Sequence, residues 1–123
     1  MWQAKERAVL NSKKNIRLMG NIIDWDLLEQ HLGHHFEKES SPPLRLLLGL
    51  LYLMAMNNSS YEETLEHWCQ SPEAQYLCGG YAENINLPIR PSTLSIWNRE
   101  IGDQGIYWMR AAITVPLQSH LIH

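Results

Sequence analysis

Residues 44–56 read LRLLLGLLYLMAM, in which every residue except Arg45 and Gly49 is apolar. A membrane-spanning helix needs about 20 apolar residues. This run of 13 residues therefore fits a buried core helix better. Prolines at 42–43 and polar residues at 57–60 are typical of helix boundaries. The stretch predicts a helix that is buried on almost every side and forms the centre of a small helical domain.

The composition indicates one globular domain in a reducing compartment. A chain of 123 residues can build one self-sufficient core, and its hydrophobic content of 45% is ordinary. No N-terminal segment has the pattern of a secretion signal. The two cysteines, Cys69 and Cys78, are too few for a disulfide framework. We therefore expect a cytoplasmic protein with reduced thiols and no membrane association.

Charge is distributed unevenly along the chain. Residues 1–20 carry five basic side chains and one acidic one, a net charge of +4, whereas residues 21–123 have a net charge of −7. A basic arm on an acidic body is typical of proteins whose arm contacts nucleic acid, although a merely solvated terminus has the same composition. We expect a basic, flexible arm over 1–20, a helical domain over 21–115 and a tail over 116–123. The basic residues of the arm are Lys5, Arg7, Lys13, Lys14 and Arg17.

Helical spacing of apolar residues, without apolar–polar alternation, predicts an all-α domain with no sheet. One helix should follow Asp24 as its N-cap and end near Gly33. The apolar helix should begin with Ser41 as its N-cap and Pro42 at the first helical position. With the segments downstream, the expected class is a small single-domain bundle of about five to six helices.

Capping and stop signals divide the second half of the chain into short helices. Ser60 and Glu63 have the spacing of a capping box at the start of one helix. A serine–proline pair at 71–72 should end that helix and start the next. Two more helices are expected, one from Ser92 to Gly102 and one from about Asp103 to Ala112 that gives out at Pro116. Together they would form a helix-turn-helix-like C-terminal part.

The helix predicted over 92–102 has two contrasting faces. Leu94, Trp97 and Ile101 fall on a narrow arc that should anchor it to the core. The opposite arc carries short hydroxyls, an arginine and Ile96, which suits contacts to DNA phosphates or base edges. An ordinary solvated face, or a protein contact through Ile96, would have the same pattern. The candidate DNA-contacting residues here are Arg90, Ser92, Ser95 and Arg99.

Neither a metal centre nor an active site is predicted. His31 and His35 share a helix face at a spacing that can bind zinc, with His34 beside them, but the sequence places no further ligand. The acidic residues are helix caps or exposed faces, not the paired carboxylates of two-metal phosphoryl transfer. A phosphate-binding Gly-rich loop and an activated nucleophile are also missing. We expect no cofactor, no metal and no catalysis.

Three blocks of sequence follow one another in a definite order. They read IDWD at 23–26, PPLRLLLGLLYLMAMNNSSYEETLEHWCQSPEAQYLCG at 42–79 and LPIRPSTLSIWNREIGDQG at 87–105. Together they resemble the N-terminal domain of bacterial insertion-sequence transposases of the insertion-sequence-five type. In that family a P-x-R-L-x-x-G-L-x-Y-L helix leads into a serine-capped acidic helix and later a P-S-S-L-x-x-W/F-R-x-R-I-G segment. The resemblance covers about residues 22–110.

The resemblance implies a helical domain that helps a transposase recognise the ends of its element or assemble on them. The family's catalytic acids belong to a following domain, so the resemblance also implies a non-catalytic fragment truncated before that domain. Ile96 and Asn98 stand where the family tends to be more basic. DNA is the expected partner. Self-association, pairing with a full-length transposase, or a decayed remnant without activity are the alternatives.

Overall fold

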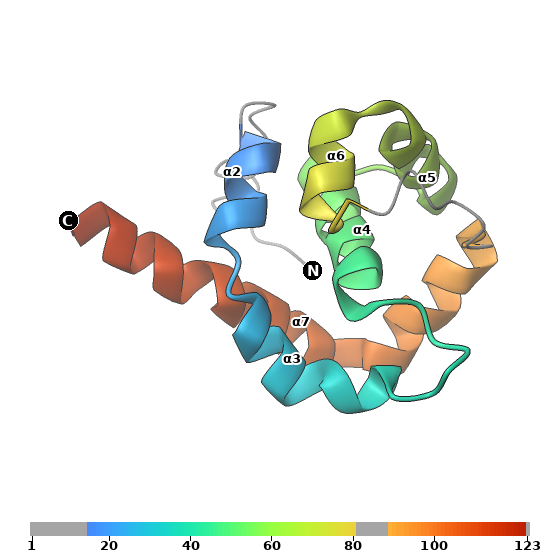
Figure 1. Ribbon diagram of the computed structural model, residues 1–123, viewed down its shortest axis with the longest axis horizontal. Helices are drawn as coiled ribbons and strands as arrows, with labels where there is room; N and C mark the ends of the chain where they lie inside the picture. Colours follow the sequence, from blue (N-terminus) through green and yellow to red (C-terminus); the bar gives the residue numbers. More distant parts are fainter. Residues whose placement is uncertain (1–14, 81–88, 123) are drawn as a thin grey trace.

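The computed structural model describes residues 15–80 and 89–122 (Figure 1). These residues form six α-helices and one short 3-10 helix, and no strand occurs among them. The predicted all-α class is therefore confirmed. The elements in chain order are α2 (Asn15–Ile22), α3 (Trp25–Leu32), η1 (Gly33–Phe36), α4 (Leu44–Asn57), α5 (Tyr61–Gln70), α6 (Pro72–Leu77) and α7 (Pro91–Ile122).

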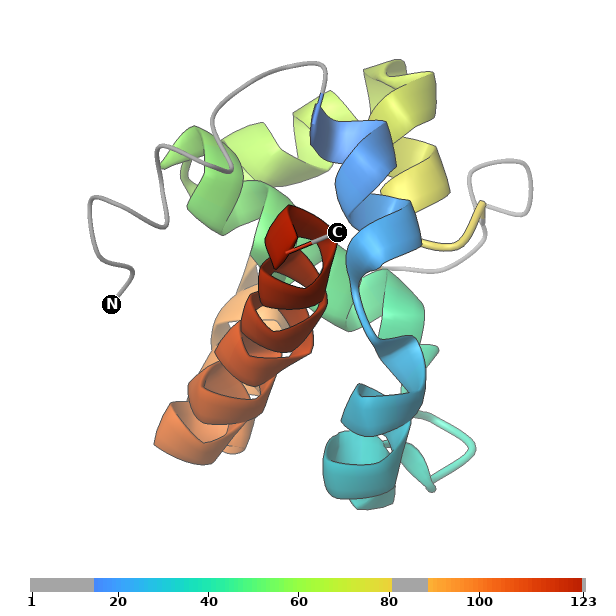
Figure 2. The ribbon, with the colours of Figure 1, turned by 90° about the vertical axis from the view of Figure 1, so that its left-hand side faces the viewer.

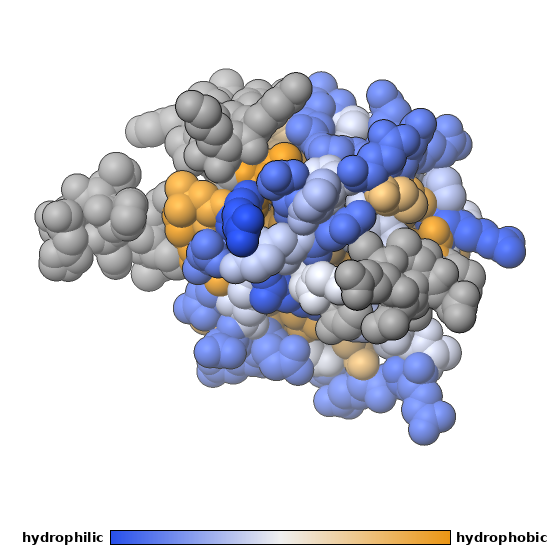
Figure 3. Space-filling view, turned by 45° about the horizontal axis from the view of Figure 1, so that its top comes forward, coloured by the Kyte–Doolittle hydropathy of each residue, from blue (hydrophilic) through white to orange (hydrophobic). Residues whose placement is uncertain are grey.

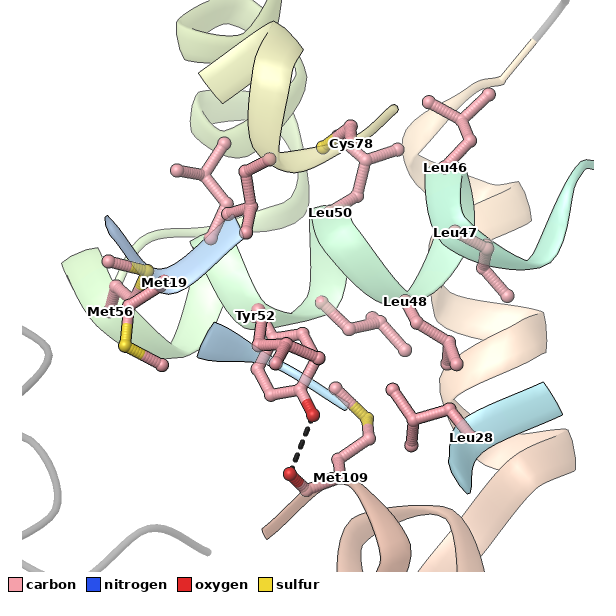
Figure 4. Close-up of a cluster of buried hydrophobic side chains, with 14 of the residues drawn as sticks. Met19, Leu28, Leu46, Leu47, Leu48, Leu50, Tyr52, Met56, Cys78 and Met109 are labelled. Atoms are coloured by element: carbon pink, nitrogen blue, oxygen red, sulfur yellow. Dashed lines mark hydrogen bonds between the residues drawn. The ribbon is translucent and has the colours of Figure 1, made fainter. Parts of the chain in front are cut away.

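Helix α4 runs through the middle of the domain, and the other helices pack around it (Figure 1). Nine of its fourteen residues are buried. Figure 4 shows the side chains that surround it. They include Met19 of α2, Leu28 of α3, Cys78 at the end of α6 and Met109 of α7. The predicted buried helix is therefore confirmed. Within the ranges that the structure describes, no helix is long and apolar enough to cross a membrane.

The start of α4 differs from the prediction. The helix begins at Leu44 with Pro43 as its N-cap, at φ −57° and ψ 139°, and no side chain caps it. The cause is steric, because a residue that precedes a proline is pushed out of the helical region. Pro42 precedes Pro43 and so cannot be the first helical residue, and Ser41 is not the cap. At the other end Asn58 has a left-handed φ of 50°, which asparagine tolerates.

The predicted starts of α5 and α6 are confirmed. The Ser60 hydroxyl accepts the backbone N–H of Glu63 at 3.1 Å, and the Glu63 carboxylate accepts the N–H of Ser60 at 3.0 Å. These two bonds from Ser60 hold the pKa of Glu63 below its ordinary value. The Ser71 hydroxyl caps α6 by accepting the N–H of Ala74 at 3.2 Å, with Pro72 in the first turn.

Helix α2 begins within the range 1–20 that was expected to be a flexible arm and ends at Ile22, beyond it. Ile16 and Met19 are buried in the core, so the helical body includes residues 15–20. Gly20 lets α2 approach α6, because a Cβ atom there would lie 3.2 Å from the ring of Tyr76. The sequence analysis did not predict this helix, because only Ile16 and Met19 form its buried side and basic residues dominate residues 1–20. Residues 1–14, and with them most of the expected arm, lie outside the described residues.

Helix α7 has two halves that meet at Gly102. This residue has φ 52° and ψ −150°, a backbone conformation that only glycine adopts readily. The predicted break at Gly102 is therefore confirmed, and the halves run in different directions (Figure 1). The two halves are joined by the single residue Gly102, whereas the two helices of a helix-turn-helix motif are joined by a turn of three or four residues.

The second half of α7 continues through Pro116 to Ile122, beyond the expected end. Proline has no N–H and cannot donate to the carbonyl four residues earlier, which here belongs to Ala112. That carbonyl instead accepts the backbone N–H of Asp24, the N-cap of α3, at 3.1 Å. The bond gives the Ala112 carbonyl a partner and ties α3 to α7, which lie side by side in Figure 2.

Candidate nucleic-acid interface

The candidate interface lies on the first half of α7, and packing determines which way this half faces. Leu94 and Ile101 are buried in the core. The Trp97 ring stacks on the Phe36 ring with centroids 4.8 Å apart and planes within 8°. These contacts fix the rotation of the helix about its own axis. Residues at the opposite helical positions are therefore held toward solvent.

The exposed face carries the residues that the sequence predicted for it. Ser92 and Arg99 are exposed, and Ser95 is half-buried. Their spacing of three, four and seven residues places them on one side of the helix, over about 10 Å of its length. Arg90 is exposed just before the first turn. Neither Arg90 nor Arg99 forms an ion pair with any residue that the structure describes, so both guanidinium groups can bind an anion.

Asn98 occupies one of the positions where a more basic residue was expected from the resemblance. Its Nδ2 donates to the hydroxyl of Tyr61 on α5 at 3.1 Å. The side chain thus joins α7 to α5 and is not part of the exposed face.

Arg17 lies on a different face. Its Cζ atom is 5.1 Å from the ring centroid of Tyr76, whose hydroxyl is hydrogen-bonded to Asn21. Helix α2 and the first half of α7 lie on opposite sides of α4 and α6 (Figure 1). Arg17 therefore does not form one patch with the arginines of α7. The remaining predicted arm residues lie outside the described part of the chain: Lys5, Arg7, Lys13 and Lys14.

Arg45 has a structural role that the sequence analysis did not assign. Its guanidinium donates to the carbonyls of Leu77 at 3.3 Å and Tyr76 at 3.1 Å, and its Cζ lies 4.7 Å from the Trp25 ring centroid. Both carbonyls are at the C-terminal end of α6, where positive charge is favourable. These contacts explain the one charged residue in the apolar helix and exclude Arg45 from the candidate interface.

The rest of the surface limits where DNA can approach. Helix α5 presents Glu62, Glu63 and Glu66 to solvent, and these carboxylates would repel phosphates. On the face seen in Figure 3, hydrophilic residues dominate and apolar residues occur in small separate areas. The acidic face of α5 is therefore unfavourable for contact with a polyanion.

The histidines of α3 and η1 make aromatic ring contacts. The His31 ring stacks on Trp108 of α7 with centroids 3.5 Å apart and planes within 6°, and the rings of His34 and His35 lie 4.1 Å apart. Among the described residues, no three His, Cys, Asp or Glu side chains are close enough to hold a metal ion. The pairing of His31 with Trp108 gives this histidine a role in holding α3 against α7.

The fold and this face define a small helical domain with two exposed arginines, Arg90 and Arg99, and exposed Glu100 beside them. Residues 5–100 match the family described as Transposase domain (DUF772), and the chain belongs to that family. The chain is also 29% identical over 115 residues to a protein of Rhizobium meliloti described as uncharacterized protein ORF8 in nfe locus. That alignment covers 91% of this chain and 56% of the relative, so the chain spans about half of that protein's length. No solved structure matches the chain.

Proposed function

We propose that this transposase-family domain binds DNA at the ends of a mobile element and takes no part in catalysis itself. The observation that carries the proposal is the exposed face of α7, where Arg90 and Arg99 have no acidic partner among the described residues. Ser92 and Ser95 add hydroxyl donors between them. The sequence resemblance to insertion-sequence-five-type transposases supports element ends as the target.

In the proposed complex the first half of α7 lies against the DNA backbone or in a groove. Arginine guanidinium groups bind phosphates through paired N–H donors, and serine hydroxyls add neutral contacts. The basic residues before α2 supply further electrostatic attraction, which is independent of sequence and sensitive to salt.

Removal of residues 1–14 tests the contribution of the basic residues before α2. The deletion removes Lys5, Arg7, Lys13 and Lys14 but keeps Ile16 and Met19, which belong to the core. We expect weaker binding to an element-end duplex in fluorescence anisotropy. The negative slope of log affinity against log salt should become shallower by no more than about 3.6, at about 0.9 per lost phosphate contact. An unchanged slope, with unchanged helical circular dichroism, would exclude these residues from DNA contact.

A second candidate function is pairing with a full-length transposase through the first half of α7. Ile96 favours this function because it is 61% exposed on the same face. If the face binds protein, Ile96→Glu should abolish co-purification with the full-length transposase of the element. Leu18→Glu is the matched control, since Leu18 is a 45% exposed apolar residue on α2. Equal co-purification of both variants and the unmodified chain would exclude this function for Ile96.

A further inference from the structure

A cavity of about 470 Å³ lies between η1, the segment that leads into α4 and the first half of α7. One wall comes from residues within 34–41, and the other from Ile96, Trp97 and Glu100. Its volume is in the range of about 300–1,000 Å³ that small-ligand sites have. The cavity adjoins the candidate interface, because Ile96 belongs to both.

The first wall is rich in hydrogen-bond donors that have no partner in the described part of the chain. The side chains of Lys38, Ser40 and Ser41 make no hydrogen bond or ion pair to any described residue, and all three line the cavity. His35 also lines it, and its Nε2 is buried without a hydrogen-bond partner. A buried polar atom without a partner is costly. Together these groups can supply donors to an anion.

The second wall is mostly apolar. One face of the Trp97 ring is covered by Phe36, and Ile96 stands beside it with most of its side chain exposed. Among the described residues that line the cavity, Glu100 is the one acidic side chain. Donors on one side and an aromatic and an aliphatic side chain on the other are what a nucleotide requires, because its phosphate needs donors and its base or sugar needs apolar contact.

We propose that this cavity binds the phosphate of a nucleotide, with the base or sugar against Ile96 and Trp97. The phosphate can come from the backbone of a DNA strand held on α7, which rests on the proposed function, or from a free nucleotide. Lys38 supplies the positive charge, Ser40, Ser41 and the His35 ring supply hydrogen-bond donors, and Glu100 opposes the anion. Glu100 therefore weakens phosphate binding at the cavity.

The first arm of the test uses the full chain without DNA. The amide signals of the ¹⁵N-labelled protein are followed while inorganic phosphate or deoxyadenosine monophosphate is added, with sodium chloride at equal ionic strength as the control. We expect shifts confined to residues 34–41 and 96–100, the two walls of the cavity. Lys38→Gln should abolish them and Lys38→Arg should retain them, because the interaction requires the charge.

The second arm uses DNA and a pair of charge-matched variants. Glu100→Gln should raise the affinity for an element-end duplex several-fold. Glu62→Gln makes the same charge change on exposed α5, outside the cavity, and should change the affinity by less than twofold. Lys38→Gln should make the negative slope of log affinity against log salt shallower by about 0.9, the value for one phosphate contact.

The two arms separate this proposal from the proposed function. Phosphate-dependent shifts at the cavity without DNA binding would support the cavity and contradict DNA binding by the chain. DNA binding with no cavity shifts, and equal behaviour of the Glu100 and Glu62 variants, would overturn the cavity proposal. Shifts that sodium chloride reproduces would overturn it as well, since they would reflect ionic strength alone.

Discussion

Replacement of Gly49 by alanine is expected to lower the free energy of unfolding by about 3 kcal/mol. A Cβ atom at this position would lie 2.8 Å from the Cα and 2.9 Å from the Sγ of Cys78. The first contact is with backbone, so α4 and the end of α6 must move apart to relieve it. Such a movement would also disturb the bonds from Arg45 to the same end of α6. Urea denaturation followed by circular dichroism measures the loss.

Gly33→Ala is the matched control for the Gly49 substitution. A Cβ atom at Gly33 would approach only the Glu29 carboxylate, at 3.0 Å, and that flexible group can move away. Gly33 also has a helical backbone, with φ −56° and ψ −32°. We expect a change of less than about 1 kcal/mol. If both substitutions cost the same, the close approach of α4 to Cys78 is not what makes Gly49 necessary.

Replacement of Tyr52 by alanine is expected to cost about 4 kcal/mol, because the ring is fully buried at the centre of α4. The ring packs edge-on against Trp25 at 6.1 Å, and its hydroxyl donates to the Met109 carbonyl at 2.6 Å (Figure 4). Tyr52→Phe keeps the ring and should cost about 1–2 kcal/mol, the effect of losing a buried hydrogen bond. Equal losses for the two variants would contradict this division between ring and hydroxyl.

Alkaline pH gives a second measurement on Tyr52. Burial raises the pKa of its phenol well above the ordinary value. The unfolded chain loses this proton near pH 10, whereas the folded chain keeps it until a higher pH. Stability from this group is therefore present below about pH 10 and is lost as pH rises toward the folded pKa. The unmodified chain should lose more unfolding free energy between about pH 9 and 11 than Tyr52→Phe does.

Local signals in the sequence predict much of the fold. The apolar stretch at 44–56, the Asp24 cap and the Ser60–Glu63 box all correspond to helices in the structure. Each of these features depends on side chains only a few residues apart, so the local sequence is sufficient to predict it. The break at Gly102 is also local, because it depends on the backbone freedom of one residue.

The features that the sequence does not predict depend on distant partners. Helix α2 is short and is stabilised by the burial of Ile16 and Met19. The continuation of α7 through Pro116 depends on the Asp24 N–H, which satisfies the Ala112 carbonyl. The cavity beside Ile96 forms because η1 and α7 come together in the fold. None of these contacts follows from residue spacing along the chain.

The candidate interface was predicted only in part. The spacing of residues on 92–102 gave its exposed face, because the buried positions of a helix determine the opposite ones. The separation of Arg17 from this face depends on where α2 packs. The role of Arg45 in binding the end of α6 depends on contacts across more than thirty residues of sequence.

The most direct test of the central claim is the salt dependence of DNA binding by the Arg90→Gln/Arg99→Gln double variant, measured by fluorescence anisotropy on an element-end duplex. Arg110→Gln, a change of the same type on the second half of α7, is the control once its helical circular dichroism matches the unmodified chain. If the exposed face of α7 contacts phosphates, the double variant should bind more weakly. The slope of log affinity against log salt is negative, and in the double variant it should become shallower by about 1.8. The control should keep the slope of the unmodified chain. Identical slopes and affinities for the double variant and the unmodified chain would contradict the account.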